Sequence, residues 1–117
     1  MKDINNILEI IKRNFSQGDI SYSINDYLSN TKSVHLKVGK LEADIMYGKQ
    51  LKYPSDEWKD DIAISWNDKR NGYTGGMYGV PLEDKSEEEI VIEMIQRVFH
   101  IEPQKGALQL SIFDFGL

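Results

Sequence analysis

The sequence predicts an α+β fold, with an N-terminal helix, an antiparallel meander of four or five strands and a C-terminal helix. Apolar residues recur at helical spacing in residues 3–16 and again in residues 86–100. Between these segments, apolar and polar residues alternate in several short runs, as is typical of strands with one buried face. Two apolar helical faces need a sheet face to cover, so we expect both helices on one side of the meander.

The first expected helix covers residues 3–16. Asp3 suits the N-cap, because its carboxylate can accept a hydrogen bond from a free backbone N–H of the first turn. Gly18 follows the helix and can adopt the left-handed conformation in which many helices end. The apolar stripe of this helix consists of Ile4, Ile7, Leu8, Ile11 and Phe15.

Four or five strands are expected next. Alternating runs cover residues 20–24, 34–38, 41–47 and 62–66. Gly39-Lys40 is typical of a tight hairpin turn, and residues 68–72 carry turn-forming side chains throughout. A short strand over residues 73–80 is expected to return from that turn, although glycines weaken the pattern.

The second expected helix covers residues 86–100. Ser86 followed by Glu89 matches the capping box, in which these two side chains satisfy free N–H groups of the first turn. His100 at the other end is placed to complement the helix dipole. The buried face consists of Ile90, Val91, Met94, Ile95, Val98 and Phe99.

Composition indicates a single cytoplasmic domain. The chain has 117 residues, enough for one proper core, and it contains no cysteine, which excludes disulfides and thiolate metal sites. No apolar run approaches the about 20 residues needed to cross a bilayer, and no signal peptide is expected. We expect the domain over residues 1–102 and a tail over residues 103–117, because Pro103 to Gly106 is typical of a linker.

Charge favours a protein partner. The net charge is −5, from 19 acidic and 14 basic residues. Non-specific binding to phosphate backbones relies on clustered Lys and Arg, so we expect no direct binding of nucleic acid and no membrane contact. No cofactor is expected, and the sequence says nothing about oligomeric state.

A cluster of titratable side chains is expected at one hairpin. Glu42 and Asp44 lie two residues apart on a strand and therefore share a face, and His35 lies on the neighbouring strand. Such a trio can bind a divalent metal or perform acid–base chemistry. The alternative is the solvated face of a half-exposed sheet, and we therefore assign no metal or catalytic residue.

Two further patterns leave alternatives open. Asp44 with Glu57-Trp58-Lys59 faintly resembles the Asp…Glu-x-Lys arrangement of a large nuclease family. Acidic residues also cluster near the second helix. They can stabilise the N-terminus of this helix through its dipole. Alternatively, they can form an acidic patch that an inhibitor or immunity protein would present to a basic cleft. The acids of this possible patch are Glu83, Asp84, Glu87, Glu88 and Glu89, with Asp56, Glu57, Asp60 and Asp61.

The end of the sequence carries a peptide motif. Gln109-Leu110-Ser111-Ile112-Phe113 resembles the Gln-Leu-Ser/Asp-Leu-Phe peptide by which many proteins dock on the bacterial DNA polymerase sliding clamp, with Ile in place of one Leu. The segment also partly fits the eukaryotic and archaeal clamp peptide through Gln109, Ile112 and Phe115. The alternation of residues 107–113 is equally the pattern of a half-buried strand, so a structural role stays open.

The resemblance implies a non-enzymatic protein that docks on the clamp. Gln109 is the expected polar anchor, and Leu110, Ser111, Ile112 and Phe113 complete the peptide, with Phe115 as a further contact. Such a protein would be a recruited accessory or an inhibitor, as a phage or mobile element would encode. The alternatives are an acidic inhibitor, immunity or anti-defence protein that acts through its folded surface, and a metal-dependent enzyme at His35, Glu42 and Asp44.

Overall fold

The structure, a computed structural model, confirms the α+β class. It describes residues 3–16, 18–28, 31–52, 57–70, 72, 74–83 and 85–104. In chain order the elements are α1 (Ile4–Asn14), β1 (Ser21–Leu28), β2 (Thr31–Val38), β3 (Leu41–Lys52), β4 (Glu57–Asp68), β5 (Thr74–Pro81) and α2 (Glu87–Phe99).

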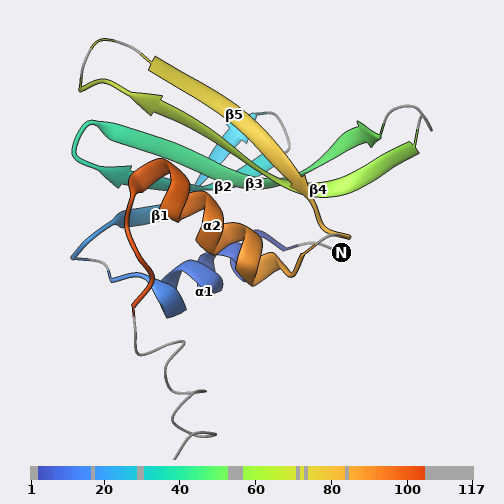
Figure 1. Ribbon diagram of the computed structural model, residues 1–117, viewed down its shortest axis with the longest axis horizontal. Helices are drawn as coiled ribbons and strands as arrows, with labels where there is room; N and C mark the ends of the chain where they lie inside the picture. Colours follow the sequence, from blue (N-terminus) through green and yellow to red (C-terminus); the bar gives the residue numbers. More distant parts are fainter. Residues whose placement is uncertain are drawn as a thin grey trace, which may run out of the picture.

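The strands form one antiparallel meander. They lie in the order β1-β2-β3-β4-β5, so every strand pairs with its neighbours in sequence and β1 and β5 are the edges. Figure 1 shows both helices on the same side of this sheet, as the sequence predicts. The sheet curves around them, and α1 lies mainly under the β1–β2 side while α2 lies under the strands that follow.

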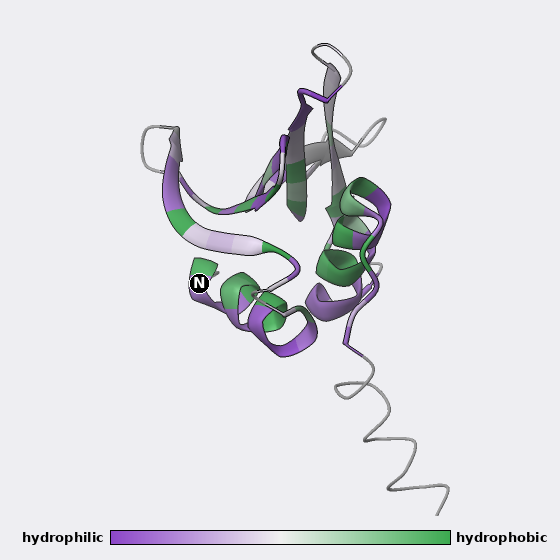
Figure 2. Cartoon of the chain, turned by 90° about the vertical axis from the view of Figure 1, so that its left-hand side faces the viewer, coloured by the Kyte–Doolittle hydropathy of each residue, from purple (hydrophilic) through white to green (hydrophobic). Residues whose placement is uncertain are grey.

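The core lies between the helices and the concave face of the sheet. Ile64 pairs with Ile45 on one side and Tyr78 on the other, which puts apolar side chains of three neighbouring strands on one face. In Figure 2 the hydrophobic sides of both helices turn toward this face. Each fully buried aliphatic side chain contributes about 1.5–3 kcal/mol before entropic costs, so this layer supplies most of the driving force. Residues with no exposed surface include Ile7, Ile11, Val34, Leu36, Ile45, Ile62, Ile64, Val91, Met94 and Ile95.

Both helices begin as the sequence predicts and end earlier. The Asp3 carboxylate accepts a hydrogen bond from the Asn5 N–H at 3.0 Å, and Ser86 Oγ accepts one from the Glu89 N–H at 3.2 Å. The first helix ends at Asn14, because Phe15 turns to extended backbone while its ring stays in the core. His100 ends α2 in the left-handed conformation, with φ of 58°.

The long hairpin of β3 and β4 was not predicted in full. Both strands have 12 residues, so they extend well beyond the expected segments 41–47 and 62–66. Their distal ends are polar and pair through the backbone, and the ring of Trp58 there is 66% exposed. Apolar and polar residues alternate only where one face of a strand is buried. The pattern therefore does not reveal the part of a strand pair that projects beyond the core.

Close packing against Trp66 explains two neighbouring glycines of β5, Gly75 and Gly76. A Cβ atom added at Gly76 would lie 2.7 Å from Cζ2 of the Trp66 ring, and one added at Gly75 would lie 2.5 Å from the Trp66 carbonyl oxygen. Trp66 packs against the core and meets Tyr78 edge to face, with ring centroids 6.0 Å apart. Gly75 and Gly76, which weaken the sequence pattern, thus leave room for the close approach of β5 to β4.

We expect Gly75→Ala to destabilise the protein by about 1–3 kcal/mol, because the new methyl group meets backbone that cannot move aside cheaply. Urea unfolding measures the change. Gly18→Ala is the control, since its nearest contact would be an ordinary 3.6 Å to Ser16 Oγ. Equal effects at the two positions would contradict the packing argument.

Candidate functional site

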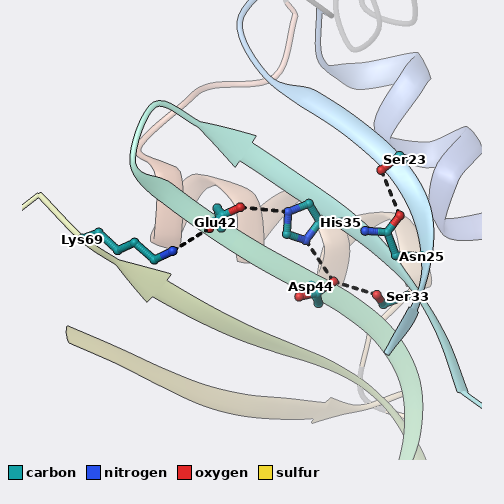
Figure 3. A network of polar contacts seen from close by, with 7 residues as sticks. All are labelled: Ser23, Asn25, Ser33, His35, Glu42, Asp44 and Lys69. Atoms are coloured by element: carbon teal, nitrogen blue, oxygen red, sulfur yellow. Dashed lines mark hydrogen bonds and ion pairs between the residues drawn. The ribbon is translucent and has the colours of Figure 1, made fainter. Parts of the chain in front are cut away.

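The predicted trio converges on the face of the sheet away from the helices. His35 Nδ1 lies 3.2 Å from Asp44 Oδ1, and His35 Nε2 lies 3.3 Å from Glu42 Oε1. The hairpin turn at Gly39-Lys40 makes this possible, because it sets His35 opposite Asp44 in the β2–β3 ladder. Figure 3 shows the imidazole held between the two carboxylates.

Two residues that the sequence did not single out complete the network. Ser33 Oγ donates a 2.7 Å hydrogen bond to Asp44 Oδ1, and Lys69 Nζ lies 3.4 Å from Glu42 Oε2 (Figure 3). Ser33 lies two residues before His35, so the alternation of β2 already put both on one face. Lys69 had no local signal, because its contact depends on the pairing of β3 with β4.

The cluster is a partly exposed, hydrogen-bonded network on the outer face of the sheet. The side chains of His35, Glu42 and Asp44 are 27%, 26% and 23% exposed, and Ser33 is fully buried. Hydrogen bonding from His35, followed by that from Lys69, holds the pKa of Glu42 below its usual value. A neutral imidazole donates through one nitrogen, whereas the imidazolium donates to both carboxylates.

This geometry does not favour the metal hypothesis. Both ring nitrogens of His35 face carboxylate oxygens, and the carboxylates also contact Ser33 and Lys69. Within the part of the chain that the structure describes, no group of three or more His, Asp or Glu side chains is arranged to hold a metal ion. What these contacts do is tie β2, β3 and the turn after β4 together on the outer face.

The faint nuclease pattern is not assembled. Glu57 and Lys59 lie on β4, which begins before the run 62–66 that alternation predicts as a strand. However, Glu57 pairs with Lys52 while Asp44 pairs with Ser65. Asp44 and Lys52 are eight residues apart on β3, which corresponds to about 26 Å at the usual rise of a strand. The three residues therefore do not form one site.

The acids at the start of α2 join the two helices and the sheet. The Glu88 carboxylate accepts hydrogen bonds from Arg13 Nε at 3.2 Å and from Asn14 Nδ2 at 2.9 Å. The bond from Asn14 is the main reason that the pKa of Glu88 is lowered. Glu87 accepts a 2.8 Å bond from the Tyr47 hydroxyl, and burial raises the pKa of that phenol.

The remaining acids of the possible patch are divided. Glu89 contacts Ser86 in the capping box at 3.2 Å, and Glu83 lies 3.6 Å from Lys59. Asp61 is only 5% exposed, so it cannot join a surface patch. Asp56 and Asp84 lie outside the described residues. Most of the acids seen here have a local structural contact, which weakens the acidic-surface alternative.

The peptide at the end of the sequence lies outside the described residues. These include Gln109, Leu110, Ser111, Ile112, Phe113 and Phe115, so both the docking peptide and the strand alternative for residues 107–113 stay predictions. The division at residue 102 also stays a prediction. The last described residue is Gln104, whose backbone N–H donates a 2.6 Å bond to the Asn14 carbonyl.

Comparison of the chain with protein-family models, curated proteins and solved structures gave no significant match. In the described part of the chain, neither helix is long and apolar enough to span a bilayer.

Ser33→Ala should lower the free energy of unfolding by about 1–3 kcal/mol, because it removes a buried hydroxyl that donates to a carboxylate. Ser23→Ala is the matched control on β1, since Ser23 is exposed and bonds Asn25 at 3.2 Å. Urea titration should show a change below about 0.5 kcal/mol for the control. A similar loss of unfolding free energy for both variants would show that the buried Ser33–Asp44 hydrogen bond does not stabilise the protein more than an exposed one.

Glu42→Gln should destabilise the protein at neutral pH and lose this effect in acid. Because the folded-state pKa of Glu42 is lowered, its ionised carboxylate stabilises the fold above the usual value of 4.5. That contribution disappears as the pH falls through the lowered pKa. Urea unfolding at pH 7, 4.5 and 3 should therefore show a shrinking difference between wild type and variant.

Glu9→Gln is the control for this pH series. The Glu9 carboxylate lies 3.7 Å from Lys12 on the exposed side of α1, where ion pairs contribute little. Its effect should stay near zero across the series. A pH-independent effect of Glu42→Gln would contradict the role given to its charge.

Proposed function

We propose that this protein is a non-enzymatic cytoplasmic module that docks on the DNA polymerase sliding clamp through residues 109–113. The observation that carries the proposal is the pentapeptide Gln109-Leu110-Ser111-Ile112-Phe113, which meets four of the five positions of the bacterial clamp peptide and has Ile for Leu at the other.

Each residue type has a physical reason in this peptide. The Gln109 amide offers both donors and acceptors, so it can anchor the peptide in a small polar pocket. Ile112 and Phe113 then fill an apolar cleft, each contributing about 1.5–3 kcal/mol before costs. Ordering the segment offsets much of this, which gives a dissociation constant on the order of micromolar. An affinity of this size suits exchange on a shared ring.

The fold supports a separable peptide. Among the described residues, the hydrophobic core is built from side chains between Ile7 and Phe99, and every strand of the sheet precedes α2. The described core and sheet are thus made by residues that precede the pentapeptide in the chain. Contact with the clamp can have two outcomes. It can recruit the domain to DNA, or it can block the clamp against other proteins, as a phage or mobile-element inhibitor would.

Gln109→Ala with Phe113→Ala should weaken binding to purified clamp by about 100-fold, because it removes the polar anchor and one apolar plug. Calorimetry measures the affinity, and the melting temperature should stay that of wild type. Lys105→Ala with Asp114→Ala is the matched control, because it truncates two side chains of the same segment outside the pentapeptide. Its affinity should stay within about threefold of wild type.

Two results would oppose the proposal. Unchanged clamp affinity in the Gln109→Ala/Phe113→Ala variant would remove the pentapeptide as the contact. A large drop in melting temperature would show that these side chains are structural. Deletion of residues 107–117 tests the acidic-surface alternative, because a surface inhibitor retains its partner without this segment, whereas a docking peptide loses it.

A further inference from the structure

A hollow of about 480 Å³ lies between the end of β4, the start of β5 and the last turn of α2. It is lined by the half-buried Trp66 and Tyr78, whose rings meet edge to face with centroids 6.0 Å apart. Gly76 pairs with Trp66 across the two strands and adds no side chain over the indole. The hollow therefore offers partly exposed aromatic surface, and its volume lies in the range of small-molecule sites.

Arg97 of α2 brings positive charge into this hollow. Its guanidinium carbon lies 5.4 Å from the ring centroid of Tyr78, so the cation packs over that ring. Among the described residues, the arginine ion pairs are those of Arg13 with Glu88 and of Arg70 with Asp68, and Arg97 has none. The acids on the same side of α2 are engaged elsewhere, because Lys85 donates to Glu93 at 2.8 Å and Gln96 donates to Glu102 at 2.6 Å.

The other charged groups of the hollow are already paired or lie at its exposed side. Arg70 also lines it, but the Asp68 carboxylate accepts two hydrogen bonds from that guanidinium, at 2.6 and 2.9 Å. His100, the C-cap of α2, is exposed. A planar guanidinium has N–H donors along its edge, which match the oxygens of a phosphate group. Two of the three arginines of a chain with net charge −5 thus line one hollow, and Arg97 is the one with donors available to a ligand.

We infer that this hollow binds a small anion of the nucleotide class, in which a planar aromatic ring is joined to a phosphate. Aromatic surface alone suits a neutral apolar ligand, and an arginine alone suits any anion. Here the two lie side by side, since Arg97 packs on Tyr78, so one small molecule reaches both. Its ring packs against Trp66 and Tyr78, and its phosphate accepts hydrogen bonds from Arg97.

This site goes beyond the proposed function and does not depend on it. The residues that carry it belong to β4, β5 and α2, whereas the clamp proposal rests on residues 109–113. Loss of clamp binding in Gln109→Ala/Phe113→Ala would therefore leave the site untouched, and loss of ligand binding would leave the clamp proposal untouched. The inference gives the folded domain a ligand of its own.

Titration of the full chain with AMP tests the site. The chain has two tryptophans, and Trp58→Phe leaves Trp66, which lines the hollow, as the only fluorescent indole. AMP should quench its emission with saturation and a dissociation constant below about 1 mM. Calorimetry should show that adenosine, which lacks the phosphate, and ribose phosphate, which lacks the base, each bind at least about tenfold more weakly, because each keeps one half of the contacts.

Arg97→Gln should weaken AMP binding at least about tenfold, because it removes the charged donor to the phosphate. Lys12→Gln is the matched control, since it removes an exposed cation of α1 that lies 3.7 Å from Glu9, and its affinity should stay within about twofold of wild type. The melting temperature of each variant shows that it is folded, and the three-ligand series needs no substitution at Arg97. Absence of saturable quenching up to about 5 mM AMP, ribose phosphate binding as tightly as AMP, or equal effects of the two variants would each overturn the inference.

Discussion

The two faces of β3 impose the constraint on which the rest of the molecule depends. Leu41, Ala43 and Ile45 point to the helices and are buried, while Glu42 and Asp44 point to the opposite face. Because side chains alternate strictly along a strand, a shift of one residue in register would exchange these sets and place carboxylates in the core. The core and the outer polar network are therefore specified together.

The helices are held to this sheet by polar contacts as well as by apolar packing. Glu88 joins the start of α2 to the end of α1 through Arg13 and Asn14, and Glu87 joins α2 to Tyr47 of β3. Acids at a helix N-terminus are favoured by its dipole in any case. Here Glu87 and Glu88 also contact α1 and β3, which gives these two acids of the run a structural role beside the helix dipole.

The chemistry-bearing side chains of the outer face are engaged with one another. His35 and its two carboxylates form a bridge between strands, with Ser33 buried at one end and Lys69 at the other. Such an arrangement links the two strands, since each carboxylate has a donor at hydrogen-bonding distance, Ser33 for Asp44 and Lys69 for Glu42. The same contacts leave both ring nitrogens of His35 facing carboxylate oxygens, which is why the cluster does not favour a metal site.

The sequence by itself determined the secondary-structure elements and which side chains lie on the buried or polar face of each. Helical spacing located α1 and α2, the caps at Asp3 and Ser86 set their starts, and strand alternation put His35, Glu42 and Asp44 on the polar side. These signals are local, because each depends on residues within a few positions of one another.

Only the tertiary structure decided which distant groups meet. The lengths of β3 and β4, the Lys69–Glu42 contact and the burial of Asp61, for which Gly48 leaves room opposite, all depend on pairing between segments far apart in sequence. The same holds for the position of Arg97 of α2, whose guanidinium lies 5.4 Å from the ring centroid of Tyr78 on β5. Long-range register and the docking of helices on the sheet carry no local signature, since they are set by the packing of the whole core.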